Sequence, residues 1–164
     1  MTVMEFTPVP SPYDVRSTLG GLLGREVGVL ITDPYAAGLG ESTTYAVFVD
    51  DRLRTRAVAV ADLRFSAYAG AANAMVPPKV AEESVARGVL EERLAENLHE
   101  VLEACAATLN GDRLPRVRLH AVYAAGSTPP SDVVSYASVP GRRLDLRVDV
   151  AHYGSGRFSM VCVG

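Results

Sequence analysis

Three glutamates occur at helical spacing in one stretch of the chain. Glu96, Glu100 and Glu103 stand at positions i, i+4 and i+7 of the run LAENLHEVLEACAATLN. In an α-helix these positions lie along one face within two turns. Aligned carboxylates can accept hydrogen bonds from water or from a partner. A solvated helix surface accounts for the same pattern, because each like-charged pair costs only about 0.2–0.5 kcal/mol.

The same run resembles the signature helix of the CheC/CheX chemotaxis phosphatases. In that family an acidic residue or serine is followed four residues later by Glu, then three later by Asn and four later by a small residue. Here Glu96 matches the acidic position, Glu100 the Glu and Ala107 the small residue, whereas Glu103 replaces the Asn. The family's Pro, about two dozen residues further on, is replaced by Gly126.

The resemblance implies that this helix enters the active site of a phosphorylated receiver domain. The receiver's aspartyl phosphate and Mg²⁺ would supply most of the chemistry, so this chain is expected to hold no cofactor of its own. Glu100 would pair with the receiver's Lys, and the Asn would orient the attacking water. Glu103 has no amide donor and adds negative charge beside the phosphoryl group. Asn97, one turn before Glu100, gives the reversed order Asn-x-x-Glu and is a second candidate for positioning water.

Three functions follow as alternatives. The first is a domain of two-component or chemotaxis signalling that docks on a response-regulator receiver through Glu96, Glu100, Glu103 and Ala107, with weak or lost phosphatase activity. The second is an active phosphatase, in which Glu100 acts with Glu103 or Asn97. The third is a structural or oligomerising domain without a retained site. A homodimer is compatible with each of them.

Other residue types give weaker signals. Cys105 and Cys162 are far apart and outside any CxxC pair, which favours two buried apolar residues over a disulfide or a metal site. His99, His120 and His152 form no HxH or HxxxH pattern, so no metal site is expected. No serine has a GxSxG setting, and no glycine-rich loop carries the Lys of a phosphate cradle.

Composition narrows the class of protein. Of 164 residues, 48% are hydrophobic and 21% are charged, which is typical of a globular domain. The net charge is -3 and the basic residues are spread along the chain, so nucleic acid and anionic membranes are not expected as partners. The first ten residues lack the pattern of a leader, and no stretch approaches the roughly 18 apolar residues that span a bilayer. We therefore expect a cytoplasmic protein.

Periodicity predicts the helices that must position these residues. Apolar residues recur every three or four positions over residues 91–110, which predicts one amphipathic helix. Its apolar stripe consists of Leu94, Leu98, Val101, Leu102, Cys105 and Leu109. Further helices are expected over residues 12–23 after Ser11, 67–75 after Ser66, and 80–87 before Gly88. A single helical turn is expected near residues 132–136.

Alternating apolar residues and turn signals predict the strands. They are expected over residues 26–32, 44–49, 56–63, 117–123, 143–150 and 157–163, with turns at residues 50–52 and 154–156. Neighbouring strands in hairpins favour a mostly antiparallel sheet of about six strands with helices packed on one face. We therefore predict a single α+β domain over residues 11–164, after an N-terminal extension of residues 1–10. The resemblance to the CheC/CheX family covers most of the chain and implies the same fold.

Overall fold

The computed structural model describes residues 6–35 and 42–163. In chain order the elements are α1 (Pro12–Leu23), β1 (Val27–Ile31), β2 (Thr44–Val49), β3 (Thr55–Ala61), α2 (Leu63–Ala74), α3 (Pro78–Arg87), α4 (Glu92–Cys105), the 3₁₀ helix η1 (Ala106–Leu109), β4 (Arg118–Tyr123), α5 (Ser131–Ala137), β5 (Arg143–Val150) and β6 (Gly154–Cys162). Within the described residues no helix has the length and apolar character needed to cross a membrane.

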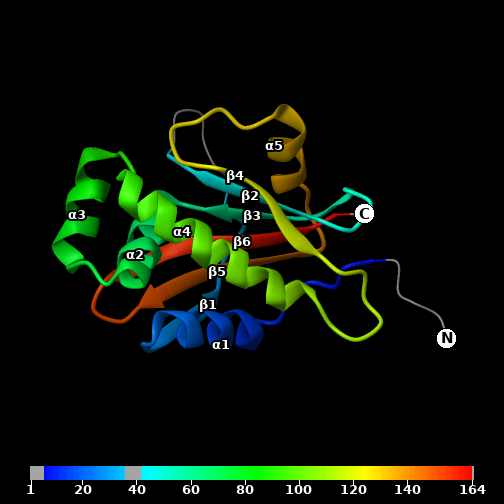
Figure 1. Cartoon of the computed structure of the whole chain (residues 1–164), viewed down its shortest axis with the longest axis horizontal. Helices are drawn as coiled ribbons and strands as arrows, with labels where there is room; N and C mark the ends of the chain where they lie inside the picture. The colour runs from blue at the N-terminus through cyan, green and yellow to red at the C-terminus, as the bar shows by residue number, and fades with distance from the viewer. Residues whose placement is uncertain (1–5, 36–41, 164) are drawn as a thin grey trace.

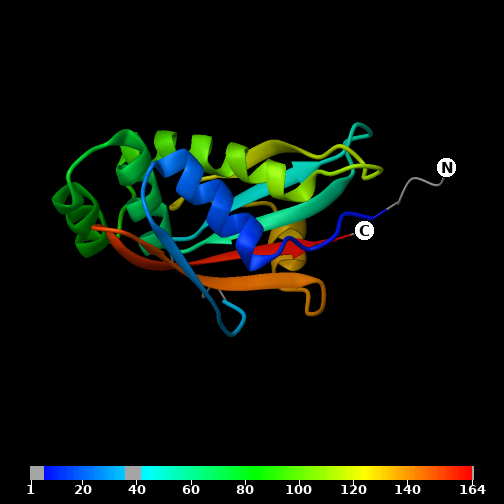
Figure 2. The same ribbon diagram turned by 90° about the horizontal axis from the view of Figure 1, so that it is seen from below.

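The six strands form one antiparallel sheet, which confirms the predicted α+β architecture. Their order is β1-β5-β6-β3-β2-β4, so the hairpins β2–β3 and β5–β6 lie next to each other in the middle of the sheet. β1 and β4 form the two edges. Figures 1 and 2 show α1 and α4 on the same side of this sheet, with α2 beside α4.

Two apolar layers cover the two faces of the sheet. The larger one joins inward residues of the strands to the apolar stripes of α1, α2 and α4. The smaller one lies on the opposite face and consists of Tyr45, Val47, Val49, Val58, Val60, Val133 and Ala137. The last two belong to α5, which was expected only as one helical turn. Because both faces are covered there, β2 is buried along its whole length, and its sequence is apolar after Thr44.

The structure describes residues 6–10 of the expected N-terminal extension. Residues 1–5 of the expected extension, and residue 164, lie outside the described residues. Thr7, within that extension, is buried, and its carbonyl accepts a hydrogen bond of 3.0 Å from Arg142 Nη1. The Cys162 thiol lies 3.7 Å from the carbonyl oxygen of Pro8. This part of the extension therefore packs against the domain.

Helix α2 begins earlier than predicted. The expected cap was Ser66, but the N-cap is Asp62, whose carboxylate accepts from Phe65 N at 2.7 Å. Asp is a strong N-cap because its oxygen satisfies a free amide of the first turn. Ser66 lies within the helix, where it is buried and donates to Asp62 O at 2.7 Å. The strand expected as far as residue 63 ends at Ala61.

The last turn also differs from the prediction. Residues 154–156, with the sequence Gly-Ser-Gly, were expected to turn the chain, but the turn lies at residues 151–153, and His152 takes a left-handed φ of 72°. Gly154 and Gly156 belong to β6. A Cβ on Gly156 would lie 2.7 Å from Phe65 Cβ and closer still to the Phe65 backbone. The missing side chain at Gly156 therefore serves helix–sheet contact and not the turn.

The close packing of α2 continues on its other side. A Cβ on Gly70 would lie 3.1 Å from the carbonyl carbon of Leu94 and closer still to its oxygen. On the sheet side, the rings of Phe65 and Phe158 stack with their centroids 4.8 Å apart. Small residues let α2 lie directly against α4, so the positions of the two helices are fixed relative to each other.

The predicted helix over residues 91–110 forms in two parts. The α-helical part ends at Cys105, and η1 continues the chain to Leu109 with 3₁₀ geometry. Asn110 Nδ2 donates to Ala106 O at 2.9 Å, so this side chain adds a hydrogen bond at the helix end. The buried stripe is the predicted one.

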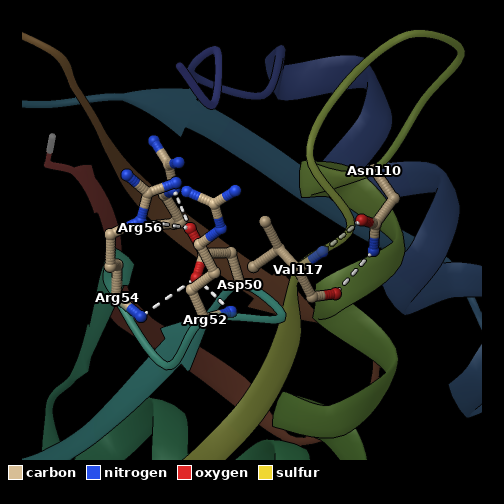
Figure 3. Close-up of polar contacts among 6 residues, drawn as sticks. All are labelled: Asp50, Arg52, Arg54, Arg56, Asn110 and Val117. Carbon is tan, nitrogen blue, oxygen red and sulfur yellow. Dashed lines mark hydrogen bonds and ion pairs between the residues drawn. The ribbon is translucent and has the colours of Figure 1, made fainter. Parts of the chain in front are cut away.

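The β2–β3 hairpin is held by one buried carboxylate. Asp50 accepts hydrogen bonds from the backbone N–H groups of Arg52 and Arg54, and its other oxygen lies 2.9 Å from Arg56 Nε and 3.0 Å from Arg54 Nε (Figure 3). Burial opposes ionisation of Asp50, but these hydrogen bonds and ion pairs together hold its pKa well below its usual range. The carboxylate is therefore ionised across the physiological range.

We expect Gly70→Ala to lower the free energy of unfolding by about 1–3 kcal/mol, because the new methyl group collides with the Leu94 backbone. Urea denaturation measures this change. Gly21→Ala is the matched control: nothing lies within 4 Å of a Cβ there, and alanine favours the helix by about 0.5–1 kcal/mol. Equal stability of Gly70→Ala and the wild type would contradict the described contact.

We expect Asp50→Asn to lower the urea midpoint at pH 7, because it removes the charge that Arg54 and Arg56 face. The folded-state pKa is depressed, so the carboxylate's contribution is present above the unfolded value of about 3.8 and is lost as pH falls below it. The gap between the two proteins should therefore narrow from pH 5 to pH 3. The exposed Asp51→Asn serves as control, and a pH-independent gap would contradict this account.

Candidate partner-docking face on helix α4

The predicted site residues lie on the solvent side of α4 and η1. Glu96, Glu100, Glu103 and Ala107 are all exposed, whereas the opposite stripe of the helix is buried. We call these four residues the α4 face. The helix is held from below by the main core and from the side by α2, so the α4 face is presented on a rigid support.

Glu100 has a hydrogen-bond partner that sequence reasoning missed. Asn73 on α2 donates from Nδ2 to Glu100 Oε2 at 2.8 Å. The same amide nitrogen lies 3.2 Å from both Asn97 O and Asn97 Oδ1. The sequence signal was one polar residue in the alanine-rich run AYAGAANAM, but only the packing of α2 against α4 shows what it faces. Asn73 therefore orients the carboxylate of Glu100.

Asn97, the second candidate for positioning water, is already engaged. Its Nδ2 donates to Arg93 O at 2.9 Å, one turn back along the helix, and its Oδ1 faces Asn73. The amide donor is thus directed to the helix backbone. Its present geometry favours a role in joining α2 to α4.

Glu103 is exposed and lacks a partner on α2 of the kind that holds Glu100. Its side chain is 69% exposed, and Oε2 lies 4.0 Å from His99 Nδ1 on the preceding turn. That pair is ionic only when His99 is protonated. Glu103 is therefore available to a partner.

Beyond Glu103 the surface is hollowed between the helix end and the edge strand. A cleft of about 510 Å³ is lined by Glu103, Ala106, Ala107, Asn110, Arg116, Val117, Arg118 and Leu119. Its walls carry opposite charges, with Glu103 on the helix, the exposed Arg116 just before β4 and the exposed Arg118 at the start of β4. The cleft adjoins the α4 face and extends the surface that a partner could contact.

Asn110 fixes the shape of this cleft. Its side chain donates to Val117 O at 2.8 Å and accepts from Val117 N at 2.7 Å (Figure 3). This pair of bonds reproduces the pairing of two strands and ties the end of η1 to the start of β4. The Asp50 hairpin lies beside Val117 in the same view, because β2 pairs with β4.

Other candidate groups are not arranged for chemistry. Burial raises the pKa of the Cys105 thiol to about 12 and that of Cys162 to about 11, although Arg142 lowers the latter slightly. Both thiols are therefore protonated and unreactive near neutral pH. Among residues 6–35 and 42–163, no three His, Cys, Asp or Glu side chains gather as metal ligands.

Comparison with solved structures identifies the fold. The FliM middle domain from H. pylori superposes with a TM-score of 0.60 at 10% identity, covering 92% of this chain and 83% of that one. The chemotaxis protein CheX from Vibrio vulnificus gives 0.53 at 10% identity, with 92% and 95% covered. A CheC-like superfamily protein from Shewanella gives 0.51 at 11% identity, with 93% and 94% covered. The chain has a CheC/CheX-like fold.

The likeness confirms the predicted fold, and it is seen only in structure. No protein-family model matches the chain, and no curated protein matches it in sequence. At identities near 10% the shared feature is the fold. The correspondence between Glu96, Glu100 and Glu103 and the signature helix of the CheC/CheX family stays a prediction.

In this CheC/CheX-like domain, a double-mutant cycle measures the bond between Asn73 and Glu100. We expect Asn73→Ala and Glu100→Ala to couple by about 0.5–1.5 kcal/mol in the free energy of unfolding, since they share a charge-assisted hydrogen bond. Asn73→Ala combined with Glu96→Ala should be additive within about 0.5 kcal/mol. A coupling no larger than in this control would show that Asn73 does not hold Glu100 in solution.

Proposed function

We propose that this CheC/CheX-like domain docks on a response-regulator receiver through the α4 face, with phosphatase activity weak or lost. The observation that carries the proposal is the exposed line of three carboxylates on a rigid helix, with Glu100 held in place by Asn73. Helix formation does not require such a line, because aligned like charges repel one another along the helix.

The chemistry of a receiver suits this face. A phosphorylated receiver presents Mg²⁺ and a Lys beside its aspartyl phosphate, and cations of this kind attract an acidic partner. Glu100, oriented in advance, would lose less side-chain freedom on binding than an unrestrained glutamate. The Mg²⁺ would belong to the receiver, and no metal of this chain's own is required.

The side chains present disfavour hydrolysis. Orienting an attacking water benefits from a group that both donates and accepts, as an amide does, and Glu103 at pH 7 only accepts. The amide of Asn97 is bonded to Arg93 O, so the reversed register offers no free donor. An active phosphatase, which is the alternative, would have to rely on Glu103 as the water-positioning group.

A structural role without any receiver is the second candidate, favoured by the likeness to FliM. The FliM structures with TM-scores of 0.61 and 0.53 are complexes of that protein with SpeE and with FliG. A domain of this fold can therefore act as a protein-binding unit. For this chain the second candidate predicts self-association, or binding to a partner that does not depend on phosphorylation.

Binding to receiver domains of the same organism tests the proposal. We expect complex formation with at least one aspartyl-phosphorylated receiver in the presence of Mg²⁺, measured by calorimetry. Glu96→Lys and Glu100→Lys should each weaken binding at least tenfold, because they oppose the receiver's cations. Glu83→Lys on α3 is the matched control, since Glu83 is equally exposed but off the α4 face. Failure to bind any receiver would overturn the proposal.

Phosphate release in the same mixtures separates docking from catalysis. We expect the wild type to accelerate release little over the receiver alone, and Glu103→Asn to accelerate it at least tenfold, because an amide then faces the attacking water. A wild type that accelerates release by orders of magnitude, and a Glu103→Ala variant that abolishes this, would instead support the active phosphatase. Sedimentation of the chain alone reports the self-association that the structural alternative predicts.

A further inference from the structure

Three arginines distant in sequence line one open cleft on the other side of α2. The cleft has a volume of about 630 Å³, and its lining includes Arg64 at the start of α2, Arg147 on β5 and Arg157 on β6. All three arginines are exposed. In a chain of net charge -3 this is a local concentration of positive charge that the sequence does not reveal.

The sheet register brings two of these arginines face to face. Arg147 and Arg157 are direct partners in the antiparallel β5–β6 pair. Side chains at directly opposite positions point to the same face with Cβ atoms about 4.5–5.5 Å apart, and like charges there are destabilising. A cross-strand arginine pair is therefore an unfavourable arrangement unless an anion lies between the guanidinium groups.

The neighbouring carboxylates do not neutralise this pair. Within residues 6–35 and 42–163, no Asp or Glu forms an ion pair with Arg64, Arg147 or Arg157. Asp62 lines the cleft, and one of its carboxylate oxygens accepts the N-cap hydrogen bond of α2. Burial raises the pKa of Asp62, although the amide of Arg157 and the charges of Arg157 and Arg64 lower it.

The two acids that flank Arg147 along β5 have other partners. Asp145 accepts from Arg143 Nε and Nη2, each at 2.9 Å, and from Ser159 Oγ at 2.6 Å. Asp149 accepts from Ser155 Oγ at 2.9 Å. By contrast, Arg143 has a carboxylate partner on the same strand, which shows how an arginine of this sheet is otherwise satisfied. In the described part of the chain, the three cleft arginines therefore lack a direct carboxylate partner, although Asp62 and Asp149 lie beside them.

The remaining lining supplies hydrogen-bonding groups of suitable size for an oxyanion. Thr32 contributes a hydroxyl group to the wall, and the half-buried Gly154 also lines it. The Tyr68 hydroxyl lies 3.4 Å from Arg64 Nη1. Arginine forks match the geometry of phosphate oxygens, which can accept from two guanidinium groups at once.

We propose that the cleft of Arg64, Arg147 and Arg157 binds the phosphate group of a small phosphorylated ligand. Arg147 and Arg157 grip the group from the two strands, and Arg64 closes the site from the first turn of α2. The bound anion relieves the repulsion between the two strand arginines, so binding and stability are linked. This site is separate from the α4 face, and its existence does not depend on receiver docking.

Titration with phosphate and pyrophosphate at constant ionic strength tests the proposal, with amide NMR shifts and the unfolding temperature as readouts. We expect saturable binding that perturbs β5, β6 and the start of α2 and raises the unfolding temperature. Arg147→Gln and Arg157→Gln should weaken binding at least tenfold while leaving the ligand-free unfolding temperature unchanged or higher, because they remove the repulsion. Arg52→Gln, exposed on the β2–β3 turn, is the matched control.

Several results would count against the phosphate site. Retention of wild-type binding in both arginine variants, or no saturable shift with either probe, would overturn the proposal. Equal binding of citrate at the same ionic strength would overturn its phosphate specificity. A fall in the ligand-free unfolding temperature of Arg157→Gln would contradict the unrelieved repulsion on which the proposal is based.

Discussion

The closeness of α2 to the elements on both of its sides determines the rest of this structure. Two glycines make it possible, because Gly70 lies against the backbone of Leu94 and Gly156 lies beneath Phe65 with no room for a side chain at either place. Helices joined by ordinary side chains pack with axes 8–10 Å apart. A methyl group at Gly70 would push α4 outward, and the short amide of Asn73 would no longer reach Glu100. The orientation of the candidate docking residue therefore depends on the absence of a side chain one turn away.

The charged groups divide into two kinds by their surroundings. Asp50 and Asp145 are buried, and each is bound by arginines that lie within 3.0 Å, so these charges are part of the folded framework. Glu96, Glu100 and Glu103 are exposed, and so are Arg64, Arg147 and Arg157, and none of these is required by the core. Exposed charges contribute little to stability, and clustered like charges oppose it. Surfaces that keep them are better explained by what they bind than by what they stabilise.

The local sequence pattern was sufficient to predict most of the helices and strands. The remaining features depend on contacts between elements that are distant in sequence. The apolar stripe from Leu94 to Leu109 predicted α4 because 3.6-residue periodicity belongs to one helix face, and the hairpins predicted the antiparallel sheet. Gly156 was misread as part of a turn, because a glycine needed for close approach looks the same in sequence as one needed for a positive φ. Asn73 and the arginine cleft could not be found at all. Their partners lie on other elements, 27 residues away for Glu100 and on a neighbouring strand for Arg157.

Glu103 shows why a domain of this kind can favour docking while disfavouring catalysis. A partner site rich in cations attracts a carboxylate more strongly than a neutral amide, so Glu103 favours association. Hydrolysis makes the opposite demand, because the attacking water needs a donor and the phosphoryl oxygens repel added negative charge. Arg116 and Arg118 strengthen this contrast, because they form a basic wall of the cleft beyond Glu103. A neutral residue at position 103 would leave this wall without a counter-charge. The acid at position 103 is therefore consistent with the proposed docking without catalysis.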